Sequence, residues 1–171
     1  MKRFAILCAG SVVAGIPAAA HAGEIFSGLY VHDVKLPTDK SGLEDGMDVQ
    51  LGYRGGRIGQ TPLQPYVFGA LNTAGETSYA ALGVAAKFGR KVYVRPGIGL
   101  AIHNGSAADY YRRDKIAFGS RILFEPELAV GAQVNSRLSL EASWIHMSHA
   151  TLFSPENPGI DNLGVRLNLA L

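Results

Sequence analysis

The sequence predicts an all-β fold: an eight-stranded antiparallel transmembrane β-barrel of the outer membrane with a filled interior. Three observations support this prediction. Segments of about ten residues alternate apolar and polar side chains, short and long connections alternate between them, and no apolar run of membrane-helix length follows residue 22. A chain that crosses a membrane without such helices must close its strands into a barrel, because an open sheet edge has no backbone partners in lipid.

The first 22 residues are predicted to be a signal peptide that is cleaved off. Lys2 and Arg3 form a positive segment, and a mostly apolar stretch runs from Phe4 to Ala20. Ala20-His21-Ala22 is a cleavage site of the A-x-A type. The barrel domain is therefore expected to comprise residues 23–171.

The charge and thiol content of the mature chain exclude some classes of function. Without Lys2 and Arg3, the 16 basic residues become 14, equal to the 14 acidic residues. A neutral chain gives no argument for nucleic-acid binding, so no nucleic-acid partner is expected. Cys8, the only cysteine, leaves with the signal peptide, which excludes thiol catalysis and disulfides in the mature chain.

Eight strands follow from the alternation, since successive side chains of a strand point to opposite faces. The last is the clearest, with leucine or valine at every odd position from Leu163 to Leu171 and polar or small residues between them. The expected strands are Ile25–Leu36, Gly46–Arg54, Gln64–Leu71, Ser78–Gly89, Val92–His103, Gly119–Gln133, Arg137–Met147 and Asn162–Leu171.

The connections and the polar faces favour a barrel over the alternative, a periplasmic β-sandwich. Tight turns are expected at residues 89–91 and 134–136, and long loops at 104–118 and 148–161. The polar faces carry charges of both signs, which suits a narrow interior where ions pair. The residues expected to form this buried ion-pair network are Glu125, Glu127, Glu141, Arg95, Arg121, Arg137 and Arg166.

Three chemically active residues share the apolar face at the end of the last two strands. The even positions of the seventh strand are apolar up to Trp144, and the same phase continues through His146 and Ser148. The odd phase of the eighth strand extends back to Asp161. We therefore expect a Ser–His–Asp group on the lipid-facing side, where a hydrogen-bonded chain satisfies the polar groups and suits nucleophilic catalysis. The alternative is a set of ordinary interfacial polar residues.

Two motifs in this region resemble a known family. His146-Met147-Ser148-His149-Ala150, followed by Pro155 to Gly164, is similar to the C-terminal signature of the lipid A 3-O-deacylases (PagL). The resemblance implies an eight-stranded outer-membrane barrel and a serine esterase that hydrolyses the acyl ester at position 3 of lipid A. It implies no metal or organic cofactor. It makes lipid A or lipopolysaccharide the expected partner. If both termini are periplasmic, the seventh strand runs outward, so the active site is expected at the level of the outer leaflet.

The resemblance also implies a role for each matching residue. Ser148 becomes the nucleophile, His146 the base and Asp161 the acid. Glu156 is the alternative acid, but no strand phase places it. Asn157 and backbone N–H groups near Ala150 or Thr151 are the expected oxyanion donors. The chain departs from the family pattern at His149, where Asn is usual, at Thr151, where Gly is frequent, and at Asp161, where Glu is frequent.

Substrate contacts are expected at two places. An apolar groove beside Trp144 and Leu163 would hold the acyl chain. Arg112, Arg113 and Lys115, in the loop 104–118, would contact lipid A phosphates. The alternative for this loop is an ordinary solvated loop with an interfacial tyrosine pair.

Two other functions remain open: a non-enzymatic structural or adhesive barrel, and another lipid A acyl-modifying enzyme such as an acyltransferase. A monomer and a homodimer are both compatible with the sequence. His32 and His103 are interpreted as isolated, and no metal-ligand spacing is found.

Overall fold

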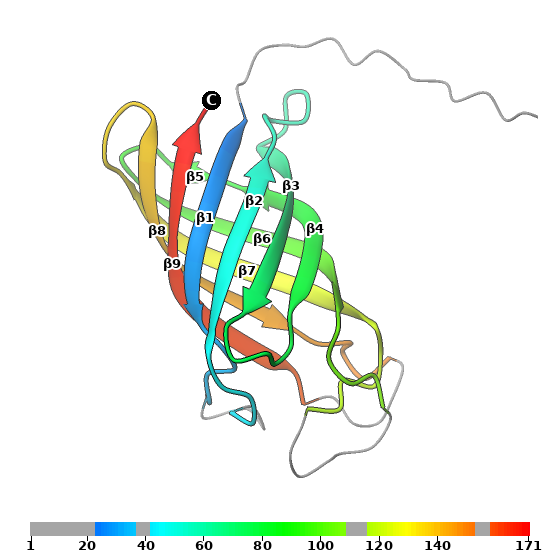
Figure 1. Cartoon of the computed structure of the whole chain (residues 1–171). Helices are drawn as coiled ribbons and strands as arrows, with labels where there is room; N and C mark the ends of the chain where they lie inside the picture. The colour runs from blue at the N-terminus through cyan, green and yellow to red at the C-terminus, as the bar shows by residue number, and fades with distance from the viewer. Residues whose placement is uncertain (1–22, 37–41, 109–115, 153–157) are drawn as a thin grey trace, which may run out of the picture.

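The computed structural model describes residues 23–36, 42–108, 116–152 and 158–171, so the expected signal peptide lies outside the described residues. Over this part of the chain the regular structure is entirely β-strand (Figure 1). No helix in it is long and apolar enough to cross a membrane. The strands are β1 (Glu24–Val31), β2 (Met47–Arg54), β3 (Leu63–Asn72), β4 (Tyr79–Ala86), β5 (Phe88–Gly89), β6 (Val92–His103), β7 (Ile122–Gln133), β8 (Leu138–Met147) and β9 (Ile160–Ala170).

The strands form a closed eight-stranded antiparallel barrel, as predicted. Consecutive strands pair from β1 to β4 and from β5 to β9, β1 pairs with β9, and β4 pairs with β6. The short β5 is a continuation of β4 after a break at Lys87, and it pairs with the start of β6. The nine labelled strands therefore count as eight barrel strands. The closed barrel has no free sheet edge, whose backbone groups would find no hydrogen-bond partner in lipid.

Two of the predicted strands are longer than the observed ones. The first ends at Val31 and not at Leu36, because Asp33 adopts a positive φ of 49° and its carboxylate accepts the backbone N–H groups of Leu43 and Glu44. The sixth begins at Ile122 and not at Gly119, whose φ is 68°. In both cases local hydrogen bonding or a residue with left-handed backbone ends the strand, although the alternation of side chains in the sequence continues.

The outer surface of the barrel is apolar. Leu51, Leu71 and Val92 are 64, 70 and 68% exposed, whereas the inward-facing neighbours Gln50 and Ala70 are each 1% exposed. Such a continuous apolar surface is unfavourable in water and suits hydrocarbon. The alternation read from the sequence is therefore the alternation between lipid and barrel interior.

Side chains fill the interior in two zones. In the half where β1 starts, Arg166 lies 2.7 Å from Glu127, and Arg95 lies 3.0 Å from Glu141. Arg54 is also fully buried in this zone. Toward the other end the interior is mostly apolar and aromatic; among its buried residues are Phe68, Tyr79, Leu123, Ile145, Met147 and Ile160.

The prediction that Arg121 and Arg137 belong to the buried ion-pair network is wrong. Arg121 is exposed and donates to the backbone carbonyls of His103 and Gly105. Arg137 is exposed and donates to the carbonyl of Ala170. Both residues lie just outside strands, where alternation no longer determines which way a side chain points.

The two ends of the barrel differ, and we call them the terminal end and the loop end. At the terminal end the C-terminus lies beside the start of β1 (Figure 1), and Leu171 N–H donates to the carbonyl of Gly23 at 3.0 Å. The tight turn at 134–136 is also here, held by the Asn135 side chain. At the loop end β6 and β8 finish and β7 and β9 begin, so the described connecting residues 104–108, 116–121, 148–152 and 158–159 lie there.

Candidate active site

The outer face of β8 extends past its last residue to Ser148. Trp144, His146 and Ser148 are half-buried, whereas Met147 and His149 between and beyond them are fully buried. Ser148 is held in this phase by β7, since its backbone exchanges hydrogen bonds with Phe124 at 2.7 and 3.1 Å. His146 and Ser148 therefore lie on the lipid side of the strand, where the sequence phase predicted them.

His146 and Asp161 face each other across β8 and β9. They are directly opposed in the register, and His146 Nδ1 lies 3.0 Å from Asp161 Oδ1. Asp161 is 2% exposed, whereas the His146 side chain is 25% exposed. With Nδ1–H donated to the carboxylate, the neutral imidazole carries its lone pair on Nε2, which is the tautomer of a general base.

Trp144 contacts both members of this pair. Its indole Nε1–H donates to Asp161 Oδ1 at 2.6 Å. Its ring stacks against the His146 imidazole with centroids 5.9 Å apart and planes 29° apart. The sequence predicted Trp144 only as a wall of the acyl groove, and the bond to Asp161 was missed.

The chain reverses direction immediately after the site. Ala150 and Thr151 have positive φ angles of 52° and 59°, and Leu152 N–H donates to the carbonyl of His149 at 3.0 Å. A β-branched residue is strained in the left-handed region, which explains why glycine suits the position of Thr151. The predicted oxyanion donors, the N–H groups of Ala150 and Thr151, belong to this strained turn.

Gly159 packs against the edge of the His146 ring. A Cβ at this position would lie 2.9 Å from His146 Cε1, and the φ of Gly159 is 66°. Both the contact and the backbone conformation therefore require glycine. The chain segment that leads into β9 thus limits how far the imidazole can move.

The loop after β1 holds the start of β9. Asp33 N–H donates to Asn162 Oδ1 at 2.9 Å, and Asn162 Nδ2 donates to the Tyr79 hydroxyl at 3.0 Å. Val34 N–H donates to the backbone carbonyl of Asp161 at 2.7 Å. The position of the Asp161 backbone therefore depends on this loop, although the loop contributes no residue to the predicted catalytic set.

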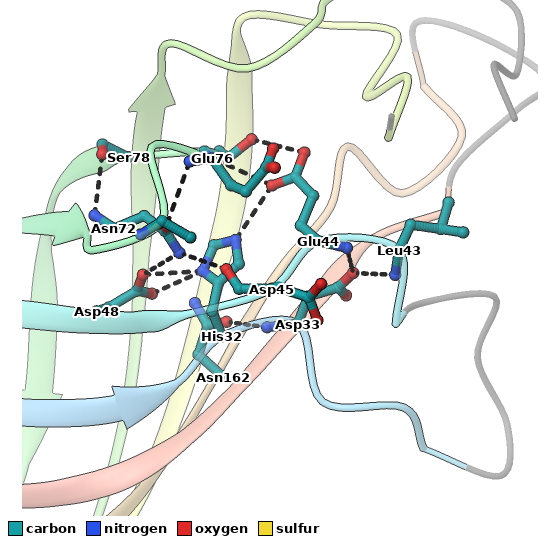
Figure 2. Close-up of polar contacts among 12 residues, drawn as sticks. His32, Asp33, Leu43, Glu44, Asp45, Asp48, Asn72, Glu76, Ser78 and Asn162 are labelled. Carbon is teal, nitrogen blue, oxygen red and sulfur yellow. Dashed lines mark hydrogen bonds and ion pairs between the residues drawn. The ribbon is translucent and has the colours of Figure 1, made fainter. Parts of the chain in front are cut away.

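A charged cluster fixes the same loop, as Figure 2 shows. His32 Nδ1 lies 2.9 Å from Asp48, and Nε2 lies 3.1 Å from Glu44, so the interpretation of His32 as isolated is wrong. Burial lowers the pKa of His32, but hydrogen bonds to Asp48 and Glu44 and their charges raise it more, to about 9. Burial raises the pKa of Glu44, but hydrogen bonds from His32 and Thr77 lower it overall. His32 is therefore a cation between two carboxylates.

Several predicted site residues lie outside the described residues: Glu156, Asn157, Arg112, Arg113 and Lys115. Within the described ranges, no group of three or more His, Cys, Asp or Glu side chains is arranged to hold a metal ion. The described part of the site consists of His146, Asp161, Trp144 and Ser148, together with the glycine and the turn that flank them.

The closed barrel with an apolar outside and a His–Asp pair on that outside places the chain among the integral β-barrel proteins of the outer membrane. The family described as lipid A 3-O-deacylase (PagL) matches residues 38–170, and the chain belongs to this family. Its function is accordingly that of a lipid A 3-O-deacylase, a hydrolase. The family resemblance predicted from the two C-terminal motifs is confirmed.

Two solved structures are similar in fold. A crystal structure of the outer membrane enzyme PagL has a TM-score of 0.62 and 18% identity, covering 86% of this chain and 99% of that one. A crystal structure of Neisserial surface protein A (NspA) has a TM-score of 0.54 and 14% identity, covering 87% of this chain and 97% of that one. At these identities the likeness establishes the barrel fold alone. A sequence comparison with curated proteins finds no match.

Proposed function

We propose that the chain removes the acyl group at position 3 of lipid A with a triad of Ser148, His146 and Asp161, working at the outer leaflet. The observation that carries this proposal is the His146–Asp161 pair, 3.0 Å apart on the outer face of the barrel. Ser148 continues the same face two residues beyond His146, about 7 Å along the strand, a gap that an imidazole spans in large part. Acid, base and serine thus follow one another in the order in which a carboxylate orients the histidine and the histidine activates the serine.

The mechanism follows from the tautomer that Asp161 imposes. His146 Nε2 takes the proton of Ser148 as Oγ attacks the ester carbonyl carbon. The tetrahedral intermediate collapses when the bond to the sugar oxygen breaks and His146 returns the proton to that oxygen. This step leaves an acyl-Ser148 ester and a free hydroxyl at position 3. His146 then deprotonates a water molecule that attacks the acyl ester, releasing the fatty acid and restoring Ser148.

The oxyanion of both intermediates needs donors near Ser148. Backbone N–H groups at Ala150 and Thr151 are close in the chain, in a turn whose strained conformation is of the kind that functional sites retain. Asn157 is proposed as the side-chain donor through the resemblance of its motif. Glu156 remains the alternative to Asp161 as the acid.

The location at the outer leaflet follows from chain direction. The predicted signal peptide and the closely spaced termini support a periplasmic position for the terminal end, and with that orientation β8 runs outward and ends with the site. An acyl chain would lie against Trp144 and Leu163, whose side chains face lipid. Arg112, Arg113 and Lys115, which lie between β6 and β7 in the sequence, would contact the phosphates of lipid A.

The test is expression in a lipopolysaccharide-producing outer membrane, followed by mass spectrometry of lipid A. The wild type is expected to remove one 3-linked hydroxyacyl chain, and Ser148→Ala is expected to abolish this loss. Ser143→Ala is the matched control, because Ser143 lies on β8 but faces the interior and is 4% exposed. Unchanged lipid A with folded wild type present would favour a structural or adhesive barrel. A gained acyl chain would indicate an acyltransferase.

A further inference from the structure

One oxygen of Asp161 accepts hydrogen bonds from two side chains of the same strand. His146 Nδ1 lies 3.0 Å and Trp144 Nε1 lies 2.6 Å from Asp161 Oδ1. An indole nitrogen can only donate, so the direction of the second bond is fixed whatever the protonation state of the histidine. The carboxylate is therefore held by a neutral donor as well as by the catalytic base.

The surroundings of Asp161 make this second donor important. Asp161 is 2% exposed, and it lies on the face that the barrel presents to lipid. A carboxylate removed from water is destabilised unless donors replace the lost solvent. Hydrogen bonds to an ionised carboxylate are short and stronger than bonds between neutral groups. The 2.6 Å bond from Trp144 is of this kind, and it supplies part of the stabilisation that water cannot supply there.

The Trp144 ring also restricts the base. Its plane lies 29° from that of His146, with centroids 5.9 Å apart, on the side of the imidazole toward the terminal end of β8. Gly159 contacts the Cε1 edge of the same imidazole. A ring held by an indole face, a carboxylate and a chain segment has little freedom to rotate away from the serine.

We propose that Trp144 is a positioning residue for deacylation: its indole N–H orients the Asp161 carboxylate, and its ring face orients His146. This inference rests on the triad proposed above. It differs from a wall of the acyl groove in a measurable way. A wall acts on substrate binding, whereas a positioning residue acts on the chemical step with little effect on binding.

The test uses the fact that Trp144 is the only tryptophan of the chain. Expression in a tryptophan auxotroph fed 3-benzothienylalanine replaces the indole N–H with sulfur at this one position and keeps the shape and stacking surface. We expect kcat for lipid A deacylation in mixed micelles to fall by about tenfold to a hundredfold, with KM changed by less than about threefold. Trp144→Phe should likewise lower kcat with little change in KM. Folding is checked by the shift of the folded barrel on unheated gels.

The matched control is Leu71→Ala on β3, which truncates an outward side chain that is 70% exposed and lies three strands from β9 in the sheet order. Its kcat should equal that of the wild type. If the benzothienyl protein keeps wild-type kcat, and Trp144→Phe raises KM without lowering kcat, Trp144 is a groove wall and the proposal is wrong. If Ser148→Ala retains activity, the triad itself fails, and this result is independent of the Trp144 substitution.

A spectroscopic measurement tests the bond directly. Protein labelled with ¹⁵N-tryptophan in detergent micelles should give one indole N–H resonance, shifted downfield and protected from solvent exchange by Asp161. Asp161→Ala should move this resonance upfield and speed its exchange, whereas Leu71→Ala should leave it in place. An indole resonance that does not respond to Asp161→Ala would overturn the proposal even if Trp144 variants lose activity.

Discussion

The backbone N–H of Val34 donates to the backbone carbonyl of Asp161 at 2.7 Å. The regular ladder between β1 and β9 ends earlier, at Val31 and Leu163. Two residues of the first loop, His32 and Asp33, are thus accommodated opposite Asn162 before pairing resumes. This bulge-like connection holds Asp161, the acid of the proposed triad, from the β1 side of β9. The base, His146, lies on the other side, on β8.

Asn162 is the central residue of this connection, so Asn162→Ala should lower both stability and activity. The substitution leaves the N–H of Asp33 and the hydroxyl of Tyr79 without their present partners. The expected loss is about 1–3 kcal/mol in the free energy of unfolding. The kcat of the folded protein should fall several-fold as Asp161 loses its fixed backbone. Thermal unfolding in detergent and lipid A deacylation measure the two effects.

Asn168→Ala is the matched control, since Asn168 is buried on the same strand near the terminal end. It should lower stability without changing the kcat of the folded protein. If Asn162→Ala is destabilised but retains wild-type kcat, the loop connection does not position the acid.

The cluster around His32 predicts that the barrel loses stability at alkaline pH. The pKa of His32 is about 9 in the folded chain against an ordinary value of 6.5. A pKa raised by folding means that the stabilisation is complete below about pH 6.5 and is lost as the pH rises through about 9. The unfolding midpoint in detergent, measured from pH 6 to 10, should therefore fall across this range.

His32→Gln should remove this pH dependence and lower stability by about 3–5 kcal/mol at neutral pH, because Glu44 and Asp48 lose a buried cation. His103→Gln is the comparison, since among the described residues the hydrogen-bond partner of His103 is the backbone carbonyl of Ser120, and Glu44 acts on it only through its charge. It should retain the wild-type slope between pH 6.5 and 9. If the unfolding midpoint of His32→Gln fell with pH as steeply as that of the wild type, a group other than His32 would cause the pH dependence.

Gly159→Ala should impair catalysis by displacing His146. The added methyl would meet the imidazole Cε1 at 2.9 Å, so the ring or the segment leading into β9 must shift. We expect kcat to fall by about tenfold or more, since displacements of this order disturb proton transfer. The measurement is initial-rate deacylation with folded protein.

Gly59→Ala separates the clash from backbone strain. Gly59 also has a positive φ, 56°, but a Cβ there would meet nothing within 4 Å. It should cost about 1 kcal/mol of stability and leave kcat unchanged. Equal losses of activity in both variants would refute a specific contact between Gly159 and the base.

The identity of the acid is tested by Asp161→Ala beside Glu156→Ala. Asp161 lies opposite His146 in the register and 3.0 Å from its Nδ1, so its removal should lower kcat by about a thousandfold. Glu156→Ala should keep at least half of the wild-type rate. Full activity in Asp161→Ala together with loss in Glu156→Ala would show that the acid is Glu156.

The barrel, the strand phases and the outward placement of His146 and Asp161 were predictable because they depend on a local period of two. The contact of Trp144 with Asp161 was not. It requires the register that sets His146 opposite Asp161, and this register is determined by pairing around the whole barrel. The cluster of His32, Glu44 and Asp48 was missed for a similar reason, since a loop folds back to join residues separated in sequence.

Strand ends were the other failure. Arg121 and Arg137 fit the alternation in the sequence. Both nevertheless lie just outside the strands, and their side chains donate to backbone carbonyl groups. Alternation indicates direction only where a ladder holds the backbone extended. Likewise, the left-handed backbone of Thr151 could not be read from its residue type, because β-branched residues rarely adopt it.

The outward position of the His146–Asp161 pair has a kinetic consequence. A site that opens sideways into lipid meets its substrate by diffusion within a plane, so the rate depends on the fraction of the surrounding lipids that are substrate, and not on moles per litre. Adding inert detergent or phospholipid at constant bulk substrate should therefore slow this enzyme as a competitive inhibitor would. Lipid composition around the barrel thereby becomes a control on activity that requires no effector molecule.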